Sequence, residues 1–228
     1  MRNSHHFPGF LIAIEGIDGA GKTTQANMVQ SVLQARHLKV MRTKEPTTGP
    51  WGQVLRDSAL TGRLSLEEEV DVFIKDRMEH VENTINPALK DGWIVIVDRY
   101  YFSNMAYQGS RGVLPEEIMH QNEVFAPEPD LLVLIDIDPK IGLERIRMRG
   151  DRANHFEETG TLEKARDIFL AIQKPYKYML DGRDSADKTC DSIVRQFSRD
   201  YTEHIVKHGG TPQQKLNATL SLFGGDAI

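Results

Sequence analysis

The residues with the clearest chemical potential lie in the stretch IAIEGIDGAGKTT, residues 12–24. Its centre, GIDGAGKT, fits the pattern G-x-x-x-x-G-K-[S/T], and it follows an apolar run and precedes a stretch with helical spacing. Glycines let backbone N–H groups converge on phosphate oxygens, a lysine can reach the outer phosphates of a nucleotide, and a threonine hydroxyl can hold Mg²⁺. We therefore predict a phosphate-binding loop that consists of Gly16, Ile17, Asp18, Gly19, Ala20, Gly21, Lys22, Thr23 and Thr24.

A second group of polar residues follows the apolar run WIVIV at 93–97. Asp98 ends this run, and an acid there can either hold a magnesium ion's water shell or cap the next helix. Because a phosphate loop is expected in the same sheet, we favour the metal role, shared with Thr23. The residues that follow combine an anion-binding guanidinium with hydroxyl, amide and aromatic groups suited to a sugar or a base, namely Arg99, Ser103, Asn104, Tyr107 and Gln108.

Two further segments offer groups for a small anionic ligand. Phe73 and Arg77 are four residues apart and therefore share one face of a predicted helix. The ring could stack on a base while the guanidinium bonds its carbonyl, although helical spacing alone favours core packing for Phe73. Arg56 follows the turn-rich segment KEPTTGP and is a weaker anion ligand, because most surface arginines are simply solvated.

Several arginines gather at the end of another predicted helix, namely Arg145, Arg147, Arg149 and Arg152. They precede or enter GDRANHFEETG, residues 150–160, which has no helical periodicity. A loop with arginines at its hinge is what a lid that closes over transferring phosphates requires. We therefore predict a lid over about 147–160.

A parallel sheet would bring these groups together. Apolar runs without alternation, typical of strands buried on both faces, occupy 10–16, 93–99 and 130–138, and weaker candidates occupy 38–43 and 176–182. Helical spacing occurs over roughly 21–36, 51–60, 67–90, 115–125, 139–149, 162–177 and 185–205. Because strands and helices alternate, the sequence predicts a doubly wound α/β fold.

Length and composition limit the possible classes of protein. The chain has 228 residues, a net charge of -5 and one cysteine, Cys190. There is no basic field to gather nucleic acid, no apolar stretch long enough for a membrane span, and no apolar core of a secretory signal near residue 1. We predict a single cytoplasmic domain over 1–228, with its core at about 10–205, a loose tail at about 206–228, and neither nucleic-acid nor membrane partners.

Taken together, these segments resemble the thymidylate kinase family, whose members transfer the γ-phosphate of ATP to dTMP. The resemblance runs over about 10–180, from IEGIDGAGKTTQ through EP, FIKDRMEH, INPAL, DRYYFSNMAYQG and PDLLVLIDIDP to RIRMRGDR. It implies a P-loop NTPase-type three-layer α/β/α fold with a five-stranded parallel sheet and helices on both faces. It also implies ATP and dTMP as substrates, Mg²⁺ as the cofactor, a role in dTTP biosynthesis, and a homodimer.

The resemblance implies a role for each residue near the base and the sugar. Phe73 is expected to stack on thymine, and Arg77 to bond a thymine carbonyl. Asn104 and Gln108 are expected near the polar edge of the base. Tyr107 is expected beneath the deoxyribose, where it would crowd a 2′-hydroxyl.

The resemblance also implies how the phosphates are held. Arg99 and Arg56 are expected on the dTMP phosphate, and Asp18 is expected to reach either the sugar 3′-hydroxyl or the water shell of the metal. Some family members carry an arginine in the phosphate loop where this chain has Gly19, and others supply it from the lid. This chain follows the second pattern, so either Arg149 or Arg152 is expected to approach the transferring phosphoryl group.

Three departures and two rival functions remain. EPTTG at 45–49 replaces the EPGGT of many bacterial members, the lid sequence is atypical, and the segment past about 206 has no counterpart.

One rival function is that of a kinase of another deoxynucleotide or of a deoxynucleoside. The other is a non-catalytic module that binds ATP and a protein partner. The chain lacks the NKxD signature of GTPases.

Overall fold

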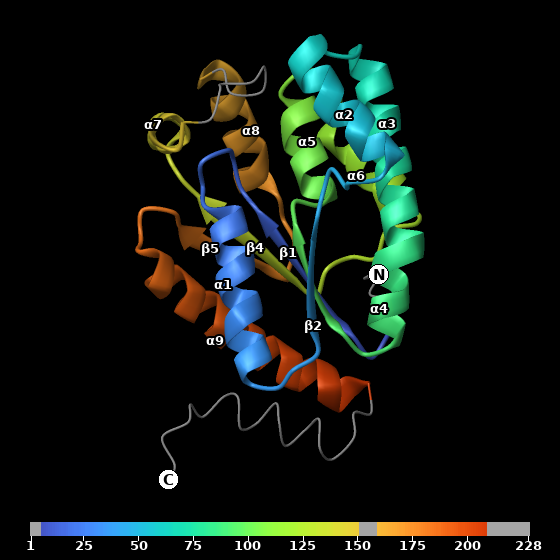
Figure 1. The fold of residues 1–228 in the computed structure, drawn as a ribbon, viewed down its shortest axis with the longest axis vertical. Coiled ribbons are helices and arrows are strands. Elements are labelled where there is room, and N and C mark those ends of the chain that lie inside the picture. The colour runs from blue at the N-terminus through green and yellow to red at the C-terminus, as the bar shows by residue number, and fades with distance from the viewer. Residues whose placement is uncertain (1–5, 151–158, 209–228) are drawn as a thin grey trace.

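The computed structural model describes residues 6–150 and 159–208 (Figure 1). Its centre is a five-stranded sheet in the order β2-β3-β1-β4-β5, in which every pair of neighbours is parallel. The strands are β1 (Phe10–Glu15), β2 (Val40–Lys44), β3 (Ile94–Asp98), β4 (Leu131–Asp136) and β5 (Lys177–Asp181). All of the strands expected from the sequence, including the two weaker ones, are confirmed.

The position of each strand explains how clearly the sequence signalled it. The three central strands β1, β3 and β4 are buried at nearly every position, as expected where helices cover both faces. The edge strands β2 and β5 are mostly half-buried and carry polar residues. Their weaker apolar runs therefore follow from their places at the sheet edges.

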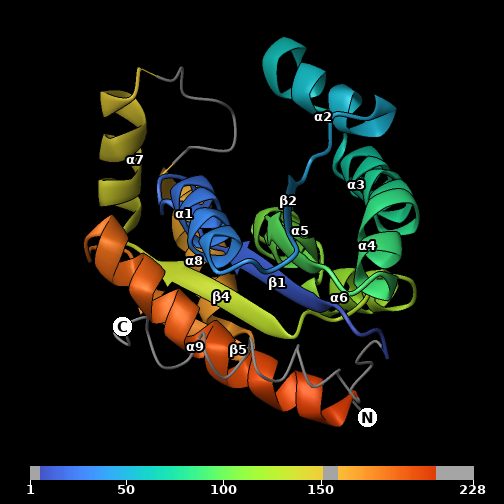
Figure 2. The same ribbon diagram turned by 60° about the horizontal axis from the view of Figure 1, so that its bottom comes forward.

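Helices cover both faces of the sheet, as Figures 1 and 2 show. Helices α1 (Lys22–Ala35) and α9 (Ala186–Lys207) pack together on one face. The other face carries α4 (Asn86–Lys90), α5 (Tyr101–Gly109), α6 (Pro115–Glu123) and α8 (Thr159–Ala171). From β1 the chain moves to β2 at one edge of the sheet, and it then crosses back through β3 and β4 to β5 at the other edge. Because connections between parallel strands are right-handed, this change of direction places the connecting helices on opposite faces. Among the described residues, no helix is both long enough and apolar enough to cross a membrane.

The remaining helices project from the carboxyl edge of the sheet or flank it. They are α2 (Pro50–Thr61), α3 (Leu66–His80), a π-helical turn at Val81–Ile85 that continues into α4, and α7 (Pro139–Met148). The helix expected over 67–90 is therefore one continuous helix over 66–90 that contains a π turn. Such a turn shifts the hydrogen-bond pattern by one residue just before Pro87, which cannot donate a backbone hydrogen bond.

One expected helix has the wrong bounds, and one helix was missed. The helix expected over 162–177 spans 159–171, since Pro175 follows and residues from 177 onward pair with β4. Helix α5 was not expected at all. Its N-cap, Tyr100, makes no side-chain capping bond, and the N–H groups of Tyr100 and Ser103 are instead bonded by the Glu15 carboxylate of β1. Because this cap comes from a residue far away in sequence, no local signal marked the start of α5.

Candidate active site

The phosphate loop connects β1 to α1 and begins where the central strand ends. Gly16, Gly19 and Gly21 have φ angles of 144°, 81° and 99°, a region that side chains disfavour. Lys22 starts α1, is almost fully buried, and donates a hydrogen bond of 2.8 Å to the Ile17 carbonyl. Burial, reinforced by the nearby Arg99 charge, lowers the pKa of Lys22 to about 8. The loop therefore holds its lysine folded over the backbone, at the positive end of α1.

Helix α7 lies against this loop at very short range. A Cβ atom placed on Gly19 would come within 2.2 Å of the Gly142 carbonyl oxygen, and one on Gly142 within 2.5 Å of the Asp18 carbonyl oxygen. The two glycines thus allow two backbones to touch. This contact gives a physical reason why the chain has no larger residue at position 19, where some members of the family that it resembles carry arginine.

Thr23 and Asp98 meet at the mouth of the loop. The register of β1 and β3 sets Ile14 beside Asp98, and the Thr23 hydroxyl donates to the Asp98 carboxylate at 2.5 Å. A hydroxyl and a carboxylate are oxygen ligands that suit Mg²⁺, which usually keeps several waters and takes only one or two protein carboxylates. Within the described residues, no group of three or more His, Cys, Asp or Glu side chains is arranged to hold a metal. The two residues fit a magnesium ion that is completed by phosphate oxygens and water.

A cavity beside the loop gathers every residue expected at the acceptor, namely Asp18, Arg56, Phe73, Arg77, Arg99, Ser103, Asn104, Tyr107 and Gln108. Phe73 is half-buried and lines this cavity, so core packing does not account for it. The Tyr107 hydroxyl donates to the Asp18 carboxylate at 2.9 Å and accepts from the Asp18 N–H at 3.0 Å. One wall of the cavity is thereby tied directly to the phosphate loop.

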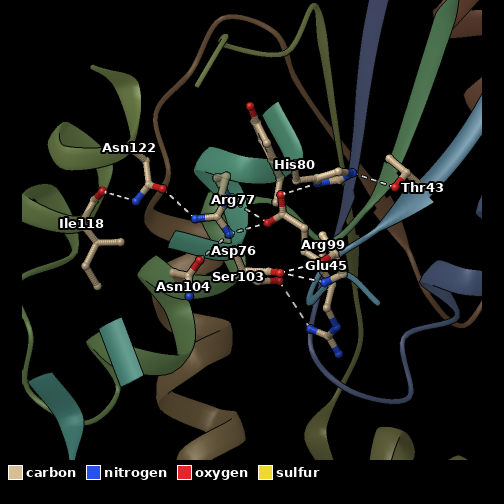
Figure 3. A network of polar contacts seen from close by, with 12 residues as sticks. Thr43, Glu45, Asp76, Arg77, His80, Arg99, Ser103, Asn104, Ile118 and Asn122 are labelled. Carbon is tan, nitrogen blue, oxygen red and sulfur yellow. Dashed lines mark hydrogen bonds and ion pairs between the residues drawn. The ribbon is translucent and has the colours of Figure 1, made fainter. Parts of the chain in front are cut away.

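Arg77 is the centre of a buried hydrogen-bond network, shown in Figure 3. Its side chain is 1% exposed and donates twice to the Glu45 carboxylate, once to Asn104 Oδ1 and once to Asn122 Oδ1. His80 bonds the other Glu45 oxygen at 2.9 Å. Burial raises the pKa of Glu45, but the Arg77 and His80 charges outweigh it and hold that pKa below its ordinary value. The guanidinium is therefore fixed before any ligand arrives.

A second carboxylate orients the other amide of the cavity. Glu69 is 1% exposed and accepts from Gln108 Nε2 at 2.6 Å, from Arg63 and from Arg111. Gln108 Oε1 in turn accepts from Asn104 Nδ2 at 3.0 Å. These bonds fix which end of each amide faces which neighbour. The amide groups on this side of the cavity are thus preoriented by charged partners.

Arg99 lies between the cavity and the phosphate loop. Its φ angle is 70°, in the left-handed region that non-glycine residues rarely adopt, and strained residues of this kind cluster at functional sites. Its guanidinium forms an ion pair with Asp18. Burial raises the pKa of Asp18, but the Arg99 and Lys22 charges hold it below its ordinary value.

The EPTTG segment is held by two other side chains. Asp76 accepts the Thr47 N–H at 2.9 Å and the Thr47 hydroxyl, and the Thr47 hydroxyl also accepts the Gly49 N–H. Arg56 donates to the carbonyls of Pro46 and Thr47. The departure from EPGGT is therefore accommodated by threonine bonds that glycine could not make.

Three cavities join end to end. Asp18, Arg56 and Arg99 line both the acceptor cavity and a second one beside the phosphate loop, which also contains Lys22, Thr23, Asp98 and Arg149. A third cavity shares Gly19, Gly21, Thr24 and Arg149 with the second, and Arg145 lines it from α7. Arg145 donates to the Gly182 carbonyl at 2.9 Å. The site is thus a continuous trough with Arg99 and the phosphate loop in its middle.

Comparison with known proteins agrees with this geometry. A family model for thymidylate kinase matches residues 14–193. The thymidylate kinase of Xanthomonas campestris pv. campestris (strain B100) is 54% identical over 188 residues, which cover 82% of this chain and 81% of that protein. That of Xylella fastidiosa (strain M23) is 51% identical over 179 residues, which cover 78% of this chain and 82% of that protein. The chain belongs to the thymidylate kinase family.

The family resemblance drawn from the sequence and the fold class it implied are confirmed. The sequence analysis gave no role to the supporting carboxylates Glu15, Glu45 and Glu69, although the motifs IEGIDGAGKTTQ and EP contain the first two, and it did not predict the place of Arg145 in the third cavity. A signal for Glu15 was present, because an acid at the end of the buried-type run FLIAIE is expected to be buried too and then requires a partner. Among the expected lid residues, Arg149 is at the end of α7, whereas Arg152 and most of 147–160 lie outside the described residues.

Proposed function

We propose that this protein transfers the γ-phosphate of ATP to dTMP, giving ADP and dTDP for dTTP biosynthesis. The observation that carries the proposal is the continuous trough, in which a base-sized cavity and a phosphate loop meet at Arg99. Membership in the thymidylate kinase family supports this choice of acceptor.

In this proposal the acceptor cavity recognises thymine and deoxyribose. The half-buried Phe73 ring stacks on the base, and the one Arg77 N–H that the network leaves over reaches a base carbonyl. Asn104 and Gln108 face the polar edge. Tyr107 and Asp18, which are bonded to each other, lie beneath the sugar, where they leave little room for a 2′-hydroxyl.

The phosphates of both nucleotides meet in the second cavity. The backbone N–H groups of residues 16–24 and the Lys22 ammonium bind the ATP phosphates, and Arg99 with Arg56 binds the dTMP phosphate. Thr23 and Asp98 would hold Mg²⁺, which when bound neutralises charge on the phosphate oxygens. The third cavity, beneath Arg145, has room for the donor nucleoside.

The reaction needs alignment rather than a general base. The acceptor phosphate is already ionised at neutral pH, since its second pKa is about 6. Lys22 and Arg99 can neutralise charge that develops on the transferring group, and Arg149 or Arg152 would complete this task from the lid over about 147–160. Arg149 lines both the second and the third cavity, which supports a part for it in this role, while Arg152 lies outside the described residues.

We further propose one kinase domain over residues 1–228, a cytoplasmic location and a homodimer. The buried single cysteine, Cys190, suits a reducing compartment. Partly exposed apolar side chains on the adjoining helices α2 and α3, among them Trp51, Val54 and Met78, offer a surface for a second copy. Light scattering coupled to size-exclusion chromatography tests the dimer.

A coupled assay of ADP release tests the function. ATP and Mg²⁺ are supplied with dTMP, dUMP, dCMP or thymidine as the acceptor. We expect rapid ADP release with dTMP, slower release with dUMP, and background rates with dCMP and thymidine. A preference for thymidine or dCMP would favour the rival kinase, and ATP binding without acceptor-dependent release would favour the non-catalytic module.

A further inference from the structure

Glu15 is a fully buried carboxylate at the carboxyl end of β1, directly before the phosphate loop. Its Oε1 accepts the backbone N–H groups of Tyr100 and Ser103 at 2.6 and 3.1 Å. Its Oε2 accepts the Ser103 hydroxyl at 2.6 Å. The carboxylate thus satisfies the first turn of α5, a task that a local N-cap side chain usually performs.

The Ser103 hydroxyl connects Glu15 to Arg99. Because its hydrogen points to the Glu15 carboxylate, its lone pairs are free to accept, and Arg99 Nη1 donates to it at 3.4 Å (Figure 3). The other side of the Arg99 guanidinium pairs with Asp18. Arg99 is therefore fixed from two directions, by the phosphate loop and by Glu15 through Ser103.

The surroundings of Glu15 carry several charges. Arg99 and Lys22 face it with positive charge, Asp18 and Asp98 lie close to the same two cations, and Tyr100 and Ser103 approach from α5. Burial raises the pKa of Glu15 to about 7, against the opposing effects of these hydrogen bonds and cations. The carboxylate is therefore costly to keep charged, and a purely structural cap could be an amide instead.

We propose that Glu15 is a positioning residue that holds Arg99 in the orientation that binds the 5′-phosphate of the acceptor, acting through the Ser103 hydroxyl. This inference rests on the proposed function. An ionised carboxylate can only accept, so above about pH 7, where Glu15 is charged, it forces the serine to donate to it and to accept from Arg99. A glutamine could turn its NH₂ group toward the serine, which would let the hydroxyl hydrogen point toward Arg99 and lose that contact.

The test compares binding of dTMP with binding of thymidine, which lacks the phosphate, by isothermal titration calorimetry. In Glu15→Gln we expect dTMP to bind roughly tenfold more weakly, as for loss of a bond to a charged group, while thymidine binds within about twofold of the wild type. Ser103→Ala should reproduce this selective loss. The double variant should bind dTMP only slightly more weakly than either single variant, because both changes break the same chain of hydrogen bonds from Glu15 through Ser103 to Arg99.

Glu128→Gln is the matched control. Glu128 is also a buried carboxylate, but its partners are Lys174 and Tyr176, away from the trough. This variant should change thermal stability without altering the ratio of the two affinities. If Glu15→Gln is too unstable to purify, Glu15→Asp replaces it. The shorter side chain keeps the charge but draws the carboxylate away from the Ser103 hydroxyl, so the same selective loss of dTMP affinity is expected.

The outcomes separate this inference from the function on which it rests. Equal loss of dTMP and thymidine affinity, or additive effects of the two variants, would show a structural role only and overturn the inference. In that case the wild type would still phosphorylate dTMP. A wild-type protein that does not bind dTMP would instead overturn the proposed function and this inference together.

Discussion

The donor and acceptor halves of the trough are built in different ways. The donor half is a short continuous segment, residues 16–24, which presents backbone N–H groups and the Lys22 ammonium, hydrogen-bonded to the Ile17 carbonyl. The acceptor half draws side chains from α3, α5 and α6, and from Glu45 directly after β2, into one buried network around Arg77. Changes to the donor half should therefore affect chemistry, and changes to the acceptor half should affect chemistry and folding together.

Arg77→Ala gives the largest expected effect. Removing Arg77 takes from the buried Glu45 carboxylate its arginine partner and leaves the His80 contact, and breaking a buried pair costs about 3–5 kcal/mol. We expect that loss in the free energy of unfolding from urea titration, together with loss of dTMP binding. Arg183→Ala, which breaks the exposed pair with Asp181, should leave the free energy of unfolding nearly unchanged, because water and salt screen exposed pairs. Equal stability of the two variants would contradict the contrast.

Lys22→Ala tests the donor half. Loss of this ammonium should lower turnover by roughly a hundredfold or more, because it removes charge that stabilises the transferring phosphoryl group. The unfolding midpoint should change far less than in Arg77→Ala. Steady-state kinetics and thermal denaturation on the same preparation measure both quantities. Turnover of Lys22→Ala within about threefold of the wild type would show that Lys22 does not take part in catalysis.

Gly142→Ala tests whether α7 shapes the phosphate loop. The added methyl group would lie 2.5 Å from the Asp18 carbonyl, so the loop or the helix must shift. We expect the KM for ATP to rise by about tenfold, as for loss of one good phosphate contact, with little change in the KM for dTMP. Gly160→Ala is the control, since a Cβ there meets nothing within 4 Å. Equal kinetics for the two variants would refute this role of α7.

The pH dependence should differ between the two halves. The pKa of Lys22 in the free protein is about 8, below its ordinary value, so Lys22 loses its proton as the pH rises through that value. The kcat/KM for ATP should therefore fall above about pH 8, since this ratio reports the free enzyme. Glu45 has a lowered pKa and stays charged, so thymidine affinity should stay level over the same range. If kcat/KM for ATP and thymidine affinity fell together above about pH 8, the predicted difference between the donor and acceptor halves would be wrong.

The sequence located the loop at Gly16 to Thr24 between a strand and a helix, where the structure has it, because this motif is local and its geometry depends on neighbours along the chain. The acceptor residues were also named from sequence, and the structure places all of them around one cavity. The partners of their supporting carboxylates were not predictable. Glu15 caps α5 from 85 positions away, and Glu45 joins Arg77 across 32 positions, so only the folded sheet brings these partners together.

Label transfer tests the central claim most directly. The protein is incubated with Mg²⁺, dTMP and ATP that carries radioactive phosphorus in its γ-phosphate, and the products are separated by thin-layer chromatography. A trough that joins a phosphate loop to a thymidylate cavity predicts label in dTDP, formed in step with ADP, and its loss in Lys22→Ala and Arg77→Ala. Label that appears only as inorganic phosphate, whether or not dTMP is present, would contradict the account.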